Sequence, residues 1–228
     1  MSENRKPSAS AANAKSLACE IKLDYARVKP LIENRLREFE AVWRDWSDEA
    51  LFAELSFCLF TPQSKAKSCW AAVCSLVERD LLLCRKPARI SANMSGVRFH
   101  RNKGRYVVEA QKLFTNNGEL RVRKTLERLG GPREIREWLV ANVIGMNYKE
   151  ASHFLRNVGK GSELAILDRH ILRNMVALGA LDELPRSIPP KAYLALEKGF
   201  MALAKRLGIP PDHLDMLLWY RAAGEVFK

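Results

Sequence analysis

Apolar residues recur at steps of three or four along most of this 228-residue chain, and that spacing limits what the chain can fold into. From Tyr25 to Trp46 the period is unbroken and predicts an amphipathic helix. Nowhere do Val, Ile and Thr alternate with polar residues over the length of a strand. The sequence therefore predicts an all-α protein of roughly ten helices.

Proline and polar residues divide the predicted helical sequence into separate segments. Ser47 is expected to cap a helix over 48–60 that is apolar nearly all round, and such a helix lies at the centre of a fold. Pro62 ends it, which leaves a polar break over 61–64. A break between two buried helices can form a pocket wall, where Gln63 would both donate and accept hydrogen bonds. A simple helix cap explains the same residues equally well.

The charge of the chain points to a class of partner. Its 38 Lys and Arg against 26 Asp and Glu give a net charge of +12. A field of this size attracts polyanions, so nucleic acid is the leading partner class, although basic proteins that never touch DNA exist. No apolar run could span a bilayer, and the first residues lack the apolar core of a signal peptide. We therefore expect a soluble intracellular protein.

The five cysteines all lie within the first 84 residues and form no CxxC pair, while the four histidines are scattered. This pattern favours reduced core thiols over metal ligation, so no metal or other cofactor is expected. Residues 1–18 are rich in Ser, Ala, Asn and Lys without apolar periodicity, which predicts a disordered tail before a folded domain over 19–228.

The residues with the most chemistry lie between 139 and 175. Two predicted helices meet there at a turn that contains Gly145 and Asn147, and such a turn aims backbone N–H groups outward, as phosphate binding requires. Gly145 supplies conformational freedom, and Asn147 is one of the few residues that tolerate a left-handed backbone. Both are therefore candidates for contact with a DNA backbone.

Lys149 and Asp168 are the candidate catalytic residues. Lys149 falls in the first turn of the second helix, where the helix dipole disfavours its charge and favours a neutral, nucleophilic amine. Asp168 begins the next predicted helix. Taken singly, one is an ordinary surface lysine and the other an ordinary cap. A glycine turn, a following lysine and an aspartate at the next helix start form a more specific combination.

The text IGMNYKEASHFLRNVG, followed by AILDRHILRNM, resembles the helix-hairpin-helix DNA glycosylase superfamily, and within it the archaeal-type 8-oxoguanine DNA glycosylase/AP lyases. The resemblance begins at ELSFCLFTPQSKA and implies an all-α fold of two lobes with the active site in the cleft between them, the hairpin lying at about 133–158. It implies a monomeric enzyme of the prokaryotic cytoplasm that excises 8-oxoguanine from double-stranded DNA and cleaves the abasic site. Lys149 and Asp168 match the catalytic lysine and aspartate of that family.

Two departures accompany the resemblance. The second glycine of the superfamily hairpin is replaced by Asn147, and no cysteine follows Cys84, so the iron–sulfur ligands of endonuclease III-type relatives are absent. Two alternatives also remain open at this stage. One is a non-catalytic DNA-binding module in which Lys149 is one more cation, and the other is a glycosylase for a different damaged base.

The last helix and the end of the chain match the base pocket of the resembled family. That pocket contains the α-carboxylate of a terminal lysine, an aspartate and a tryptophan, which correspond to Lys228, Asp215 and Trp219. 8-Oxoguanine carries an N7–H donor where guanine has an acceptor, so carboxylates could distinguish the two bases while an indole stacks on them. Residues appended after Lys228 should then harm base recognition more than folding. Without the resemblance, Trp219 would be ordinary core and Asp215 a surface acid.

Overall fold

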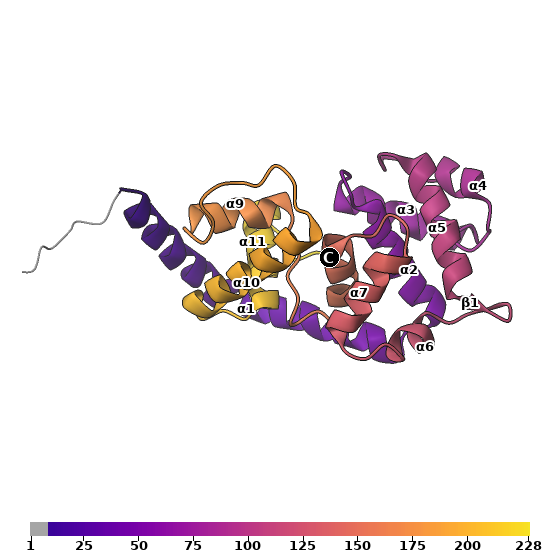
Figure 1. The fold of residues 1–228 in the computed structure, drawn as a ribbon, viewed down its shortest axis with the longest axis horizontal. Coiled ribbons are helices and arrows are strands. Elements are labelled where there is room, and N and C mark those ends of the chain that lie inside the picture. The colour runs from indigo at the N-terminus through magenta and orange to yellow at the C-terminus, as the bar shows by residue number, and fades with distance from the viewer. Residues whose placement is uncertain (1–8) are drawn as a thin grey trace, which may run out of the picture. The chain divides into compact units, whose positions relative to one another are not determined.

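The computed structural model describes residues 9–228, which form helices and one short hairpin (Figure 1). The helices are α1 (Ala9–Asp45), α2 (Asp48–Phe60), α3 (Ala66–Glu78), α4 (Pro87–Ala92), α5 (His100–Phe114), α6 (Val122–Glu127), α7 (Pro132–Asn142), α8 (Tyr148–Asn157), α9 (Arg169–Ala177), α10 (Pro190–Leu207) and α11 (Pro211–Ala223). The predicted all-α class is confirmed. The exception is the antiparallel pair β1 (Thr115–Asn116) and β2 (Glu119–Leu120), joined by Asn117-Gly118, a dipeptide typical of tight hairpins.

The disordered tail predicted over 1–18 is wrong for its second part. Residues 9–18 belong to α1, and the remainder of the predicted tail, residues 1–8, lies outside the described residues. Four alanines fall between positions 9 and 14, and alanine has the highest intrinsic helix propensity. Ile21, which is fully buried, then fixes the same helix to the core. Apolar periodicity is absent because most residues from 12 to 20 are solvent-exposed.

Two compact units make up the chain, and the larger contains residues 37–164 together with Lys228. Helix α2 lies at its centre, where every residue from Leu51 to Phe60 is buried, and it packs against α3, α5, α6 and α8. Ser47 caps α2 by accepting a hydrogen bond from the backbone N–H of Ala50 (3.2 Å). Both the cap and the central position of this helix are as predicted.

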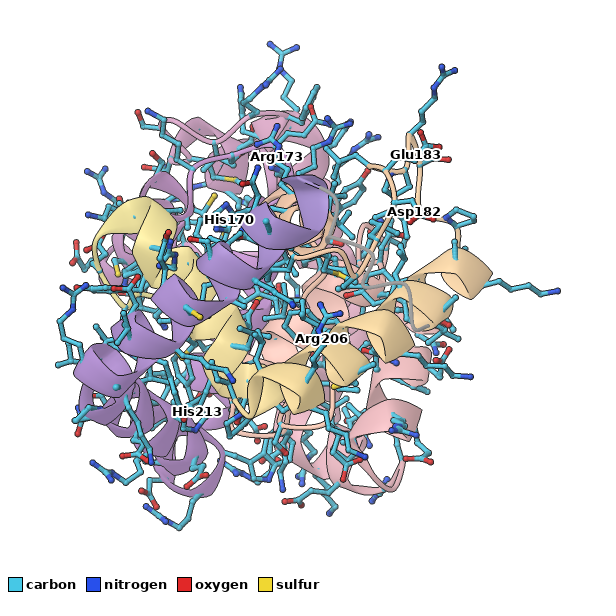
Figure 2. The ribbon with its side chains drawn as sticks, turned by 90° about the vertical axis from the view of Figure 1, so that its left-hand side faces the viewer. His170, Arg173, Asp182, Glu183, Arg206 and His213 are labelled. Carbon is cyan, nitrogen blue, oxygen red and sulfur yellow. The ribbon has the colours of Figure 1, made fainter. Side chains whose placement is uncertain are left out.

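The smaller unit contains the first part of α1 and residues 165–227. In it α11 packs against both α9 and α10. Figure 2 marks His170 of α9, Arg206 of α10 and His213 of α11. Arg206 donates to the carbonyl of Leu178 after the end of α9 (2.7 Å), and His213 Nδ1 lies 2.9 Å from the hydroxyl of Tyr25 on α1. Polar contacts between helices thus supplement the apolar core of this unit.

All five cysteines are free, but only Cys58 and Cys69 are buried, and Cys19 is exposed on α1. The expectation of core thiols is therefore wrong for Cys19. Burial raises the pKa of the Cys58 thiol well above its ordinary value, which keeps it in the unreactive form. Within residues 9–228, no helix combines the length and the apolar character needed to cross a bilayer.

Gly159, just after α8, is expected to be essential for stability. Its φ is +71°, and a Cβ at this position would lie 2.5 Å from the Cα of Glu40 on α1. Gly179 has a similar φ of +65°, yet a Cβ there would meet nothing within 4 Å. Gly179→Ala should therefore cost only the left-handed penalty of about 1–2 kcal/mol. Gly159→Ala should cost at least about 2 kcal/mol more, because the backbone of α1 must also move. Urea unfolding measures both, and equal losses would contradict the steric argument.

Candidate active site

The turn between α7 and α8 is held by buried residues on both sides, and its middle is exposed to solvent. Val143 and Met146 are buried, whereas Ile144 between them is 55% exposed. Gly145 has φ +86°, and a Cβ on it would lie 2.3 Å from the ring of Tyr106. Only glycine satisfies both the left-handed backbone and this close approach. The predicted helix-hairpin-helix is therefore present, with its glycine required by packing.

Asn147 plays a different part in the turn from the one predicted. Its backbone is extended (φ −112°, ψ −178°), so the argument from a left-handed conformation is wrong. Asn147 is instead the N-cap of α8 and forms a capping box with Glu150, whose carboxylate accepts from the Asn147 backbone N–H (3.3 Å). This reciprocal cap satisfies donors at the first turn of α8 and thereby fixes the helix start that carries Lys149.

Lys149 reaches from α8 to the end of the central helix. Its ammonium donates to the hydroxyl of Thr61 (3.2 Å) and lies 3.5 Å from the carboxylate of Glu150. Thr61 in turn donates to the carbonyl of Cys58 (2.8 Å). The Lys149 side chain is 22% exposed, so it is held by the protein without being sealed from solvent. Gln63, two residues beyond Thr61, is exposed and has a left-handed backbone (φ 56°).

His153 lies one helical turn after Lys149 and was not singled out from the sequence. It is buried and packs edge-on against the ring of Phe57 (centroids 5.4 Å apart). Burial lowers the pKa of His153 well below its ordinary value, and the charges of Arg156 and Lys149 act in the same direction. Both effects disfavour the charged form of this ring. In the sequence, the signal that could have identified His153 is its position four residues after Lys149, on the same face of the helix.

Lys228 belongs to the same unit as Lys149 and is held through its side chain. Its ammonium forms an ion pair with Glu54, which is fully buried in α2, and lies 3.6 Å from the ring centroid of Trp70. The second oxygen of Glu54 accepts from the amide of Asn157 (3.2 Å). A buried carboxylate needs such partners, so the ion pair anchors the last residue of the chain.

Asp168 is the N-cap of α9 in the smaller unit. Its Oδ1 accepts from the backbone N–H groups of His170 and Ile171, both at 2.8 Å. Within the described part of the chain, Oδ2 has no hydrogen-bond partner, and the side chain is half-buried. The predicted cap is confirmed, and one carboxylate oxygen is free to face a ligand.

His170 connects the start of α9 to the last helix. Its Nε2 lies 2.7 Å from the carbonyl of Leu218, and its ring centroid is 5.1 Å from that of Trp219. Trp219 is 40% exposed, so it is not ordinary core. Asp215 is only 3% exposed, so it is not a surface acid either. Asp168 and Trp219 are thus joined through His170, for which no functional role was predicted.

Comparison with known proteins addresses the family. The model of the 8-oxoguanine DNA glycosylase family matches residues 32–209. The chain belongs to this family. An 8-oxoguanine DNA glycosylase/AP lyase of Fusobacterium nucleatum is 43% identical over 209 residues, which covers 92% of this chain and 96% of that one. A relative of the same name from Methanocaldococcus jannaschii is 32% identical over 90% of this chain and 96% of its own length.

Solved structures of the family share the fold. The 8-oxoguanine DNA glycosylase of Thermotoga maritima superposes with a TM-score of 0.83 at 33% identity, covering 94% of this chain and all of that one. The Methanocaldococcus jannaschii enzyme in complex with a 15mer DNA containing 8-oxoguanine also gives 0.83, at 29% identity, with coverage of 93% and 100%. The helix-hairpin-helix glycosylase fold expected from the sequence is therefore confirmed.

The cap formed by Asp168 leads to a stability prediction that does not depend on activity. Asp168→Ala removes the acceptor of two backbone N–H groups and should lower the free energy of unfolding by about 1 kcal/mol. Asp168→Asn keeps a good N-cap acceptor and should cost only a fraction of that. Urea unfolding of both variants at neutral pH measures the difference. Equal losses would show that the cap contributes nothing to stability.

Proposed function

We propose that this protein is a bifunctional base-excision repair enzyme, which removes 8-oxoguanine from double-stranded DNA and cleaves the abasic site that results. The observation that carries the proposal is the half-buried primary amine of Lys149, fixed at the start of the second hairpin helix in a member of this family. The net charge of +12 supports a polyanionic substrate. We further propose that the enzyme acts as a monomer in the cytoplasm of a prokaryotic cell.

The reaction begins with extrusion of the damaged nucleotide, because the duplex hides the glycosidic bond; unstacking costs a few kcal/mol. After it loses a proton, the amine of Lys149 attacks C1′ of the sugar, and the base leaves with the electron pair of the glycosidic bond. The C1′–O4′ bond then breaks, O4′ takes its electron pair and a proton from the attached nitrogen, and a protonated lysine–sugar Schiff base remains. Removal of a C2′ proton then expels the 3′ phosphate by β-elimination, which cuts the strand. An amine nucleophile gives this covalent intermediate, whereas an attacking water does not.

Asp168 is proposed to stabilise the positive charge that develops on the sugar as the base departs. Its Oδ1 is committed to the N-cap, which orients the carboxylate, and its Oδ2 is left to face the substrate. A preoriented charge of this kind acts without reorganisation during the reaction. The backbone around Gly145 and Asn147 is proposed to contact phosphate, since helix starts present N–H groups and a favourable dipole.

Base recognition is proposed to involve Gln63, Asp215, Trp219 and Lys228. Asp215 is a buried acceptor on α11, suited to the N7–H donor that distinguishes 8-oxoguanine from guanine. The exposed indole of Trp219 offers a stacking face and packs against the ring of His170. Lys228 is immobilised by Glu54 and Trp70, and Gln63 presents an exposed amide.

Borohydride trapping tests the lysine mechanism, because reduction converts the Schiff base into a stable crosslink. Wild type should be trapped on duplex that contains 8-oxoguanine. Lys149→Gln should lower the trapping rate at least about 1,000-fold. Lys112→Gln, which removes an exposed lysine of α5, serves as the control and should leave the rate unchanged. An undiminished crosslink in Lys149→Gln would sink the mechanism, and duplexes carrying other lesions in the same assay establish the substrate.

Trp219→Ala separates recognition from stability. Stacking on an aromatic side chain contributes about 1–3 kcal/mol per base, so excision under subsaturating conditions should fall roughly 10- to 100-fold. Because the indole is 40% exposed, stability should change little. Trp46→Ala is the matched control, since Trp46 is 39% exposed and is not one of the residues proposed to recognise the base. Equal activity losses in the two variants would argue against a stacking role.

A further inference from the structure

A buried lysine on α5 holds the loop that supports Lys149. Lys103 is only 3% exposed, and its ammonium donates to the carbonyls of Phe60 and Pro62, both at 2.7 Å. Its third hydrogen bond goes to the hydroxyl of Ser64 (3.1 Å). These acceptors lie about forty residues earlier in the chain, so Lys103 joins α5 to the end of α2 across a long sequence separation.

The three acceptors span the polar break after α2. Phe60 is the last residue of α2, and its carbonyl is one of those that a helix end leaves without an intrahelical donor. Pro62 and Ser64 flank the left-handed Gln63. The Ser64 hydroxyl also accepts from the backbone N–H of Arg98 (3.0 Å). One ammonium thus fixes both sides of a backbone conformation that L-residues rarely adopt.

Thr61 lies inside the segment that Lys103 fixes. Its hydroxyl is the acceptor for the Lys149 ammonium, at 3.2 Å. The position of that hydroxyl depends on the backbone between Phe60 and Pro62, whose two carbonyls Lys103 holds. The backbone that Lys103 holds therefore carries the hydroxyl that contacts the Lys149 amine.

We propose that Lys103 is a positioning residue for Lys149. An ammonium has three N–H donors around one atom, which suits three converging acceptors, whereas a guanidinium is planar and directs its donors in a fork. Burial lowers the pKa of Lys103, as does the charge of Lys149, while Cys69 and Glu150 act in the opposite direction. Holding a cation in so buried a place is costly, and its retention fits a geometric demand of the site. The inference rests on the proposed function of Lys149.

A double-mutant cycle with Thr61→Val tests the inference, with the single-turnover trapping rate on 8-oxoguanine duplex as the readout. Lys103→Met should lower the rate about 10- to 100-fold, the range expected when a reacting group shifts by about 1 Å. Affinity for duplex with a tetrahydrofuran abasic analogue should change less than about threefold, because binding does not need the aligned amine. In the Thr61→Val background, Lys103→Met should cost much less, since both changes act through one hydroxyl.

Two further variants keep the test decisive. Lys112→Met removes an exposed lysine from the same helix and should match wild type. If Lys103→Met does not fold, as judged by urea unfolding, Lys103→Arg replaces it in the cycle. The arginine keeps the charge at the helix end but not the three-donor geometry, so its rate should also fall, by a smaller factor.

A folded Lys103 variant that is trapped at the wild-type rate would overturn the inference. Fully additive effects of the Lys103 and Thr61 substitutions would also overturn it, because a purely structural lysine would act independently of the hydroxyl. These outcomes differ from failure of the proposed function. In that case wild type itself would give no crosslink, or Lys149→Gln would be trapped as well as wild type.

Discussion

The burial of α2 on all sides is the constraint on which the larger unit depends. Along its buried part, from Leu51 to Phe60, each polar atom that is left unpaired carries the full cost of desolvation. Yet α2 contains the fully buried Glu54, and its last carbonyls have no partner within the helix. Neighbouring elements must therefore supply donors. Lys228 and Asn157 come to Glu54, while Lys103 comes to the carbonyl of Phe60. These three donors are therefore ones that the buried helix requires.

In the smaller unit, Asp168 likewise combines a structural role with a proposed chemical one. The bonds that cap α9 also fix the orientation of its carboxylate, so a residue explained as a helix start can still have a catalytic part. The cap uses Oδ1, and the proposed catalytic role uses Oδ2. His170 extends the arrangement, because its contact with the Leu218 carbonyl fixes the start of α9 against the helix that carries Trp219 and Asp215. The helix start predicted from local sequence is thus connected to the last helix by a contact between residues 48 positions apart.

The features that could be predicted from the sequence are those with local causes. The apolar text of α2, the cap at Ser47 and the start of α9 at Asp168 follow from periodicity and cap chemistry within a few residues. The errors have long-range or competing causes. Residues 9–18 become helical because a long helix extends into them, and Asn147 is extended because Glu150 completes a capping box. Nor does a sequence show that Lys103 reaches the carbonyls of a segment some forty positions away.

The charges buried around α2 are difficult to explain by stability alone. Removing one partner of a buried ion pair is strongly destabilising, but replacing the whole pair by apolar residues is often neutral or favourable. A core built only for stability therefore has no need of both Glu54 and Lys228, or of a lysine with 3% exposure. These groups instead fix the positions of the atoms to which they are hydrogen-bonded. Hydrogen bonds to charged groups fix atoms more narrowly than apolar packing does, and the Thr61 hydroxyl, the Lys149 amine and the last residue of the chain each depend on such a bond. We interpret the buried charges as the framework that fixes the geometry around Lys149.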